Sequence, residues 1–267
     1  MNPFLLVIIL GIVEGMTEFV PVSSTGHMIL VERFINSPLV SKSFMDNFLV
    51  IIQFGAILSV VAYFWKDLTP FVKTKEEFKE KFSLWTKIIV GVLPAGVIGL
   101  LADDYISEFF MDNTTVVASM LILYGIIFIL VERKNLKGKV TSIKQMSYKL
   151  AFTIGFFQCL AMIPGTSRSG ATIVGSLLLG VSRAAAAEYS FFLAIPTMAG
   201  ATLLKLLKNG LNFTMLEWQL LIVGSVVSFV VAYVVINWFM GYIKKRTFVA
   251  FGVYRIIIGI LVLLLMK

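Results

Sequence analysis

Six uninterrupted apolar runs dominate the sequence and constrain its fold more than any other feature. Each run holds about 17 to 22 residues, which in a helix rising about 1.5 Å per residue covers most or all of a hydrocarbon core about 30 Å thick. Only 14% of the residues are charged, whereas soluble globular chains average about 25%. The period-2 alternation that is typical of an outer-membrane barrel is absent from the sequence. We therefore predict an all-α polytopic membrane protein with transmembrane helices at residues 48–65, 85–101, 115–131, 190–206, 218–239 and 248–266.

Two further apolar regions, 3–34 and 150–181, are long enough to cross a membrane, but polar clusters that contain glycine and proline interrupt them. The clusters read PVSSTGH at 21–27 and PGTSRSG at 164–170. Irregular backbone at membrane depth is tolerated only where protein or a water-filled cavity satisfies its hydrogen-bonding groups. We predict that each region forms a re-entrant helix-loop-helix hairpin, which returns to the side from which it entered.

The two hairpins belong to an internal repeat that runs the length of the chain. A shift of 144 residues pairs Gly11 with Gly155, Ser23 with Ser167, Gly26 with Gly170 and Phe48 with Phe192. After a shorter loop, a shift of 133 residues pairs Trp85 with Trp218. Because each repeat has one hairpin and three spans, the two halves are expected to be inverted, with a site at their interface. We predict a single integral membrane domain, 1–267, with inverted-topology repeats at about 1–135 and 145–267.

The distribution of charge predicts the orientation of the chain. We attribute the excess of 23 Lys and Arg over 15 Asp and Glu to membrane topology, and we expect no nucleic-acid partner. Basic residues gather in the segments 66–87, 133–149 and 244–246, whereas the segment 103–112 is acidic. By the positive-inside rule the basic side faces the cytoplasm. Both termini are then extracytoplasmic, and residues 73–82 are expected to form a surface helix at the cytoplasmic headgroups.

Glu14 and Glu18 lie four residues apart in the first hairpin, so a helix places them on one face. A carboxylate at membrane depth is unfavourable without a compensating partner. One interpretation is that the two carboxylates hold a divalent cation together with phosphate oxygens, or tune a neighbouring base. The alternative is structural, with one carboxyl protonated and bonded to backbone at the break in the helix.

His27 is the only histidine, and it follows three hydroxyl residues, Ser23, Ser24 and Thr25. A lone histidine is often a satisfied packing residue, but this segment has to line a polar cavity. We therefore assign His27 as a candidate general acid or base, or as a phosphate acceptor itself.

The second cluster combines one arginine, three hydroxyl groups and two glycines within seven positions. Small residues let the backbone approach a ligand, a helix that begins here directs amide groups toward it, and the planar guanidinium of Arg168 matches phosphate oxygens. The cluster lacks the Gly-Lys-Ser/Thr ending of a Walker A loop. The alternative is a structural ion pair between Arg168 and Glu14 or Glu18. We predict phosphate-binding residues at Ser23, Thr25, Gly165, Thr166, Ser167, Arg168, Ser169 and Gly170.

Arg255 is a further basic residue inside a predicted span. For Arg255 we expect snorkelling or pairing with a carboxyl group, in preference to a direct role with substrate. The residues of the two hairpins together suit phosphoryl transfer, which needs charge neutralisation, an aligned nucleophile and a proton shuttle. Physical chemistry alone thus predicts an intramembrane site for a phosphorylated, lipidic ligand.

At these residues the chain resembles a known family. The segments EGMTEFVPVSSTGH at 14–27 and PGTSRSG at 164–170 are similar to the two signatures of the undecaprenyl pyrophosphate phosphatases, the bacitracin-resistance family, and the likeness covers the whole chain. It implies dephosphorylation of undecaprenyl diphosphate to the monophosphate carrier recycled for peptidoglycan synthesis, a divalent cation such as Mg²⁺ or Ca²⁺, and resistance to bacitracin. It also carries over Glu14 and Glu18 as the acidic pair, Ser24 and His27 as nucleophile and base candidates, and Arg168 as a phosphate ligand.

The resulting hypothesis is hydrolysis at the extracytoplasmic side of a bacterial plasma membrane. Its catalytic residues are Ser24, His27, Glu18 and Arg168, its metal ligands are Glu14 and Glu18, and the nucleophile is left open among Ser24, His27 and water. The rival is a transporter or flippase that moves a phosphorylated polyprenyl lipid or an anion by alternating access, because inverted repeats with broken helices are equally typical of transporters. The expected partners are the lipid substrate and membrane lipids, and the sequence leaves a homodimer open.

Overall fold

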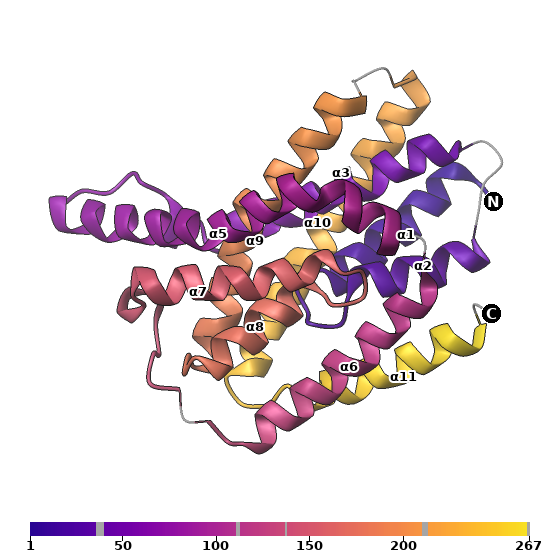
Figure 1. Cartoon of the computed structure of the whole chain (residues 1–267). Coiled ribbons are helices and arrows are strands. Elements are labelled where there is room, and N and C mark those ends of the chain that lie inside the picture. Colours follow the sequence, from indigo (N-terminus) through magenta and orange to yellow (C-terminus); the bar gives the residue numbers. More distant parts are fainter. Residues whose placement is uncertain (36–39, 111–112, 137, 210–212, 266–267) are drawn as a thin grey trace.

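The computed structural model describes residues 1–35, 40–110, 113–136, 138–209 and 213–265, and these residues are helical or irregular apart from one isolated bridge between Val140 and Val181. The order of elements in this part of the chain is α1 (Pro3–Thr17), α2 (Ser24–Phe34), α3 (Lys42–Tyr63), α4 (Trp65–Leu68), α5 (Lys75–Phe110), α6 (Thr114–Arg133), η1 (Ile143–Gln145), α7 (Tyr148–Cys159), η2 (Leu160–Met162), α8 (Arg168–Leu178), α9 (Arg183–Asn209), α10 (Met215–Ile243) and α11 (Val249–Leu265) (Figure 1).

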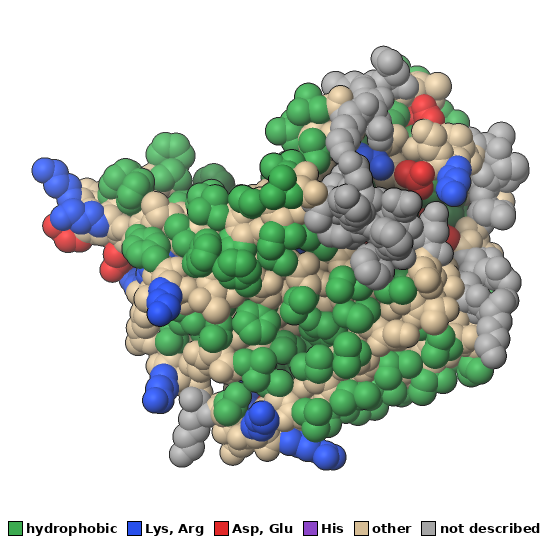
Figure 2. All heavy atoms as spheres, viewed as in Figure 1, with side chains coloured by type: hydrophobic (Ala, Val, Ile, Leu, Met, Phe, Trp, Pro, Cys, Tyr) green, Lys and Arg blue, Asp and Glu red, His purple; other side chains and the backbone are tan. Residues whose placement is uncertain are grey.

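Among the described residues, α3, α5, α6, α9 and α10 are long and apolar enough to cross a membrane. They coincide with five of the six predicted spans. The sixth prediction, 248–266, corresponds to α11, a shorter apolar helix with 17 described residues, and Met266 lies outside the described range. Figure 2 shows hydrophobic side chains across the middle of the visible face, with Lys and Arg side chains at its left tip, at its lower edge and, beside acidic side chains, at its upper right. The prediction of an all-α polytopic membrane protein is confirmed.

The surface helix predicted at residues 73–82 is confirmed as an exposed helix from Lys75 onward, and its place at the headgroups stays a prediction. From Lys75 onward these residues form the first turns of α5, which runs unbroken for 36 residues. Lys and Glu favour helix continuation, and Glu76 and Glu77 in the first turn complement the helix dipole. At about 1.5 Å per residue α5 is about 54 Å long, well beyond a hydrocarbon core of about 30 Å. Its N-terminal part therefore projects from the bundle (Figure 1).

Both interrupted regions fold as helix-loop-helix hairpins, as predicted. The loop 18–23 joins α1 to α2, and the loop 163–167 joins η2, which continues α7, to α8. The two hairpins touch, because the Ser169 hydroxyl at the start of α8 lies 3.3 Å from both the Glu18 and the Val20 carbonyl oxygens and donates to them. Figure 1 shows both loops near the middle of the bundle. The polar clusters therefore meet inside the molecule.

The packing partners of the helices follow the predicted repeat. Helix α1 packs on α10, and its counterpart α7 packs on α5, which is the counterpart of α10. The counterparts α3 and α9 contact each other, as do α6 and α11. The backbones of α6 and α11 approach closely, since a Cβ added to Gly125 would lie 2.6 Å from the Gly252 carbonyl oxygen; small residues serve this purpose between membrane helices. This exchange of partners supports the repeat, whereas the opposite orientation of the halves stays a prediction.

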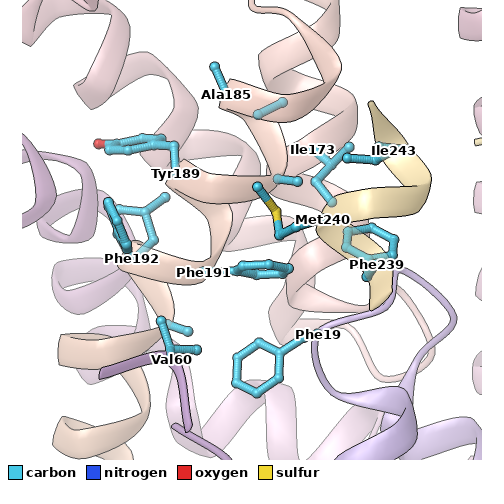
Figure 3. Packing of buried hydrophobic residues seen from close by; sticks show 14 of the residues in the cluster. Phe19, Val60, Ile173, Ala185, Tyr189, Phe191, Phe192, Phe239, Met240 and Ile243 are labelled. Atoms are coloured by element: carbon cyan, nitrogen blue, oxygen red, sulfur yellow. The ribbon is translucent and has the colours of Figure 1, made fainter. Parts of the chain in front are cut away.

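A hydrophobic cluster holds the first loop against α9 and α10 (Figure 3). Phe19 is fully buried and meets Phe191 of α9 edge-on, with 5.3 Å between ring centroids. Phe191 in turn lies 5.9 Å from Phe239 of α10. Aromatic pairs of this kind stabilise beyond the burial of their area. Because Glu18 immediately precedes Phe19, the same packing fixes the position of Glu18.

Candidate active site

Two serines at equivalent positions of the repeat begin the second helix of each hairpin. Ser23 has φ 72° and Ser167 has φ 74°, and each side chain caps its helix by accepting from a glycine amide, Gly26 at 3.4 Å and Gly170 at 3.1 Å. A non-glycine residue held at positive φ stores strain of about 1 to 3 kcal/mol and is typical of ligand sites. Each of the two predicted phosphate clusters thus contains a serine in the same unusual backbone conformation.

Glu18, Ser24 and Arg168 form a cluster that joins the two hairpins. The Ser24 hydroxyl donates to Glu18 Oε2 at 2.7 Å, and an Arg168 terminal nitrogen donates to Glu18 Oε1 at 3.1 Å. The side chains of Glu18 and Arg168 are only 5% and 9% exposed, so this ion pair is shielded from water. Hydrogen bonds between ionised groups are roughly twice as strong as neutral ones. This contact is the ion pair with Glu18 that the sequence offered as the structural alternative for Arg168. It also places a carboxylate, a hydroxyl and a guanidinium within reach of one ligand.

The guanidinium of Arg168 has donor capacity left over. Its second terminal nitrogen donates to the Ser190 carbonyl oxygen of α9 at 2.7 Å, and its face lies over the Phe19 ring, 5.9 Å from the centroid. Its Nε is buried and has no hydrogen-bond partner in the described part of the structure. A buried donor without a partner is unfavourable by about 1 to 3 kcal/mol. A phosphate oxygen would satisfy it.

Glu14 extends the cluster one helical turn back along α1. It is 1% exposed and interacts electrostatically with Glu18 and Arg168, and its Oε1 has no hydrogen-bond partner among the described residues. The described residues contain no group of three or more His, Cys, Asp or Glu side chains that could hold a metal. Two carboxylates completed by substrate phosphate oxygens are nevertheless a common arrangement for Mg²⁺. Glu14 and Glu18 therefore fit a cation that arrives with a phosphorylated ligand.

His27 lies beside this cluster with both ring nitrogens engaged elsewhere. Its Nδ1 is 2.7 Å from the Ser23 carbonyl oxygen, and its Nε2 is 2.7 Å from the Tyr254 hydroxyl of α11. The proton of Ser24 is directed to Glu18. The contacts in this structure thus make Glu18 the immediate acceptor for the Ser24 proton, although His27 was the base candidate expected from the motif.

The other predicted phosphate ligands divide into buried and exposed residues. The hydroxyls of Ser167 and Ser169 are 3.1 Å apart, and the buried Thr166 hydroxyl has no partner in the described residues. Gly165 has φ 89°, and a Cβ there would collide with the Val117 backbone of α6, so only glycine fits. Thr25 is exposed in the first turn of α2 and is not brought into the cluster by any contact described here.

Arg255 behaves differently from the expectation. It is fully buried, so it does not snorkel, and no carboxylate within the described ranges pairs with it. It instead donates to backbone carbonyl oxygens of both loops, namely Pro21 at 3.2 Å, Gly165 at 2.8 Å and Thr166 at 2.9 Å, and to Leu121 and Met120 of α6 at 3.4 Å each. Arg255 therefore ties the two hairpin loops to each other and to α6. An arginine within an apolar run was the signal for it, but the sequence does not reveal carbonyl partners.

Replacing Arg255 by Lys should destabilise the protein by about 1 to 3 kcal/mol, because a single ammonium cannot reach all five carbonyls and leaves at least one buried acceptor unsatisfied. Thermal unfolding of the purified protein in detergent measures the effect. The exposed Arg246 provides a matched control, since Arg246→Lys should leave the unfolding temperature unchanged. Equal unfolding temperatures for Arg255→Lys and the native protein would contradict the role given to Arg255.

A comparison with protein families shows to which family the chain belongs. The family model described as bacitracin resistance protein BacA matches residues 7–261. The chain belongs to the BacA family. The matched range contains both hairpin loops, the cluster of Glu18, Ser24 and Arg168, and the carbonyl-binding Arg255. The family predicted from the two motifs is therefore confirmed.

Several curated relatives of this chain are named as enzymes. An undecaprenyl-diphosphatase of Fusobacterium nucleatum subsp. nucleatum is 64% identical over 265 residues, which cover 98% of this chain and 100% of that protein. Undecaprenyl-diphosphatase 1 of Clostridioides difficile (strain 630) is 58% identical, covering 96% of this chain and 93% of the relative. An undecaprenyl-diphosphatase of Enterococcus faecalis is 52% identical, covering 97% and 95%. Similarity therefore extends over essentially the whole length of each chain.

Proposed function

We propose that this BacA-family protein is an undecaprenyl-diphosphatase, which hydrolyses undecaprenyl diphosphate to undecaprenyl phosphate and inorganic phosphate and so recycles the lipid carrier for peptidoglycan synthesis. The observation that carries the proposal is the contact of Glu18, Ser24 and Arg168 across the two hairpins. Relatives with 52% to 64% identity bear this enzyme name. The family name agrees with an effect on bacitracin resistance. The lipid substrate and the surrounding lipids are the partners that the proposal needs; it requires neither nucleic acid nor a homodimer.

The geometry favours Ser24 as the nucleophile, because its proton already has an acceptor in Glu18. In the first step Ser24 Oγ bonds to the terminal phosphorus while the bond from that phosphorus to the bridging oxygen breaks, and the lipid monophosphate leaves. The Ser24 proton passes to Glu18. Water, activated by His27, then attacks the phosphorus; the bond to Ser24 Oγ breaks as Glu18 returns the proton to that oxygen, and inorganic phosphate is released. A positioned base contributes about 10²- to 10⁴-fold to such reactions.

Arg168 and the second loop bind the phosphate in this proposal. Among the described residues of the second hairpin, the Nε of Arg168 and the hydroxyl of Thr166 are buried donors without a partner, and both are available to phosphate oxygens. Donors fixed before the reaction stabilise the charge that develops on the transferred phosphoryl group. The two terminal nitrogens of Arg168 hold the guanidinium in place, because one donates to Glu18 and the other to the Ser190 carbonyl oxygen.

We further propose that Glu14 and Glu18 hold a divalent cation, Mg²⁺ or Ca²⁺, together with the substrate. Such a cation would neutralise part of the diphosphate charge. The unpartnered Oε1 of Glu14 supports this assignment, because a buried carboxylate oxygen without a donor is an available ligand.

Removing divalent cations should lower phosphate release by about 10²-fold or more, since a bound cation contributes several kcal/mol of charge stabilisation. The rate is measured with the purified protein in excess chelator and again after Mg²⁺ or Ca²⁺ is restored. Glu14→Gln should raise the cation concentration that gives half-maximal activity. Unchanged activity in excess chelator would exclude the cation.

The orientation of the protein is also part of the proposal. We infer that both termini and the mouth of the site face the extracytoplasmic side of a bacterial plasma membrane. The start of α1 and the end of α11 lie toward the same end of the molecule (Figure 1), and the basic segments lie toward the other. Residues 111 and 112 of the acidic segment, and Lys137 and Lys267, lie outside the described residues. Labelling of a cysteine introduced at Lys139 from the cytoplasmic side alone would support this orientation, and labelling from outside would contradict it.

The rival function is transport of the same lipid by alternating access. Analysis of both products separates the two functions, with purified protein and undecaprenyl diphosphate in detergent micelles. The phosphatase should yield undecaprenyl phosphate and inorganic phosphate in equal amounts. If correctly folded protein left the diphosphate intact, and if liposomes that contain the protein moved the lipid across their membrane, the transporter would replace the phosphatase as the proposed function.

A further inference from the structure

The last helix brings a tyrosine onto the single histidine of the chain. Tyr254 of α11 and His27 of α2 lie 227 residues apart in sequence, yet the Tyr254 hydroxyl is 2.7 Å from His27 Nε2. Their rings are nearly parallel, with 5.5 Å between centroids and 9° between planes. The hydrogen bond and the stacking together define one orientation of the imidazole. Neither sequence motif contains Tyr254.

The contacts of His27 also define which nitrogen carries the proton. Its Nδ1 faces the Ser23 carbonyl oxygen at 2.7 Å, and a carbonyl oxygen only accepts hydrogen bonds. Nδ1 therefore carries hydrogen. In the neutral ring Nε2 is then the basic atom, and the Tyr254 hydroxyl donates to it. Any proton that His27 exchanges with a ligand has to pass by way of this hydroxyl or displace it.

The position of Tyr254 is itself fixed by its neighbour in the chain. Arg255 is anchored to carbonyl oxygens of both loops, including Pro21 and Gly165. Helix α11 is also in close backbone contact with α6 at Gly252. These contacts set the register of α11 against the first hairpin. Tyr254, which remains 41% exposed, is thereby presented to His27 at the edge of the cluster.

We propose that Tyr254 is a positioning residue for the phosphatase reaction, which holds His27 as the Nδ1–H tautomer and keeps Nε2 as its basic atom. This inference rests on the proposed function for its kinetic consequence, but the tautomer itself does not. The hydroxyl is the essential part, because phenylalanine would preserve the stacking and lose only the hydrogen bond. Tyr254 acts through His27 and needs no contact with substrate.

The kinetic test uses Tyr254→Phe in the full-length protein with and without His27→Ala. Losing one positioning hydrogen bond should lower kcat about three- to tenfold with little change in KM. The same substitution should have no further effect once His27 is alanine, because residues that act through one another are not additive. Tyr233→Phe, on a half-exposed tyrosine of α10, is the matched control and should retain full activity. An unchanged kcat for Tyr254→Phe, or an equal loss in both backgrounds, would overturn the proposal.

A spectroscopic test is independent of activity, and the single histidine makes it simple. With ¹⁵N-histidine labelling, the native protein should show a protonated Nδ1 and an unprotonated, hydrogen-bonded Nε2 at neutral pH. Tyr254→Phe should shift the Nε2 signal and mix the tautomers, whereas Tyr233→Phe should leave the spectrum unchanged. A native Nε2–H tautomer, or no change in Tyr254→Phe, would overturn the inference. If the native protein releases no phosphate, the proposed function fails, and the spectrum still decides the role of Tyr254.

Discussion

We expect Glu18→Gln to lower the rate of phosphate release about 10²- to 10⁴-fold, the range lost when a positioned base is removed. The amide keeps the size of the side chain but cannot take the proton of Ser24, which lies 2.7 Å from Glu18 Oε2. It also removes the charge that holds Arg168 at 3.1 Å. The rate of phosphate release from undecaprenyl diphosphate in detergent measures the effect, and the loss should fall mainly on kcat.

The control for this substitution is Glu76→Gln, an exposed carboxylate in the first turn of α5. It should change the rate by less than about twofold, because isolated surface charges contribute little. The unfolding temperature of each variant is measured in the same detergent. Full activity in a folded Glu18→Gln variant would remove Glu18 from the reaction and return the role of base to His27 or to water.

Arg168→Lys should lower the rate about 10²- to 10³-fold, similar to the loss of one preorganised donor in a charge-stabilising site. Lysine keeps the positive charge but replaces a planar fork by one flexible ammonium. It cannot reach Glu18 and the Ser190 carbonyl oxygen while also offering a donor at the position of Nε. Steady-state kinetics should show both a lower kcat and a higher KM, because Arg168 binds phosphate in the ground state as well.

The exposed Arg133 at the end of α6 offers a matched control, and Arg133→Lys should behave as the native protein. If the exchange of arginine for lysine lowers the rate at Arg168 but not at Arg133, the loss is due to the geometry of the Arg168 guanidinium. If Arg168→Lys kept native kcat and KM, Arg168 would be only a structural ion-pair partner of Glu18.

Much of the fold could be predicted because bilayer physics leaves a chain few choices. Long apolar runs have to be helices, and polar interruptions have to fold back where protein satisfies their backbone groups. The helix expected at 73–82 proved to be the N-terminal part of α5, since the end of the apolar run marks where the hydrocarbon stops, whereas α5 continues beyond it without a helix-breaking residue. The apolar runs thus predicted which residues lie within the membrane better than they predicted where each helix begins and ends.

The site could be predicted only in part, for a related reason. The repeat pointed to the meeting of the two loops, and the structure brings Glu18 to Arg168 there. Hydrogen-bond partners depend on side-chain orientation, which no spacing rule encodes. The motif therefore favoured His27 as the base beside Ser24, whereas the structure directs Ser24 to Glu18 and His27 to Tyr254. The partners of Arg255 were missed for the same reason, because they are backbone carbonyls of segments distant in sequence.

The central claim is that the two hairpins form one catalytic site through Glu18 and Arg168. The most direct test is a double-mutant cycle, in which phosphate release is measured for Glu18→Gln, Arg168→Lys and the double variant. Residues that act as a unit are strongly non-additive. The double variant should lose little more activity than the more damaging single substitution. A loss equal to the product of the two single losses would show that the residues act independently and would contradict the claim.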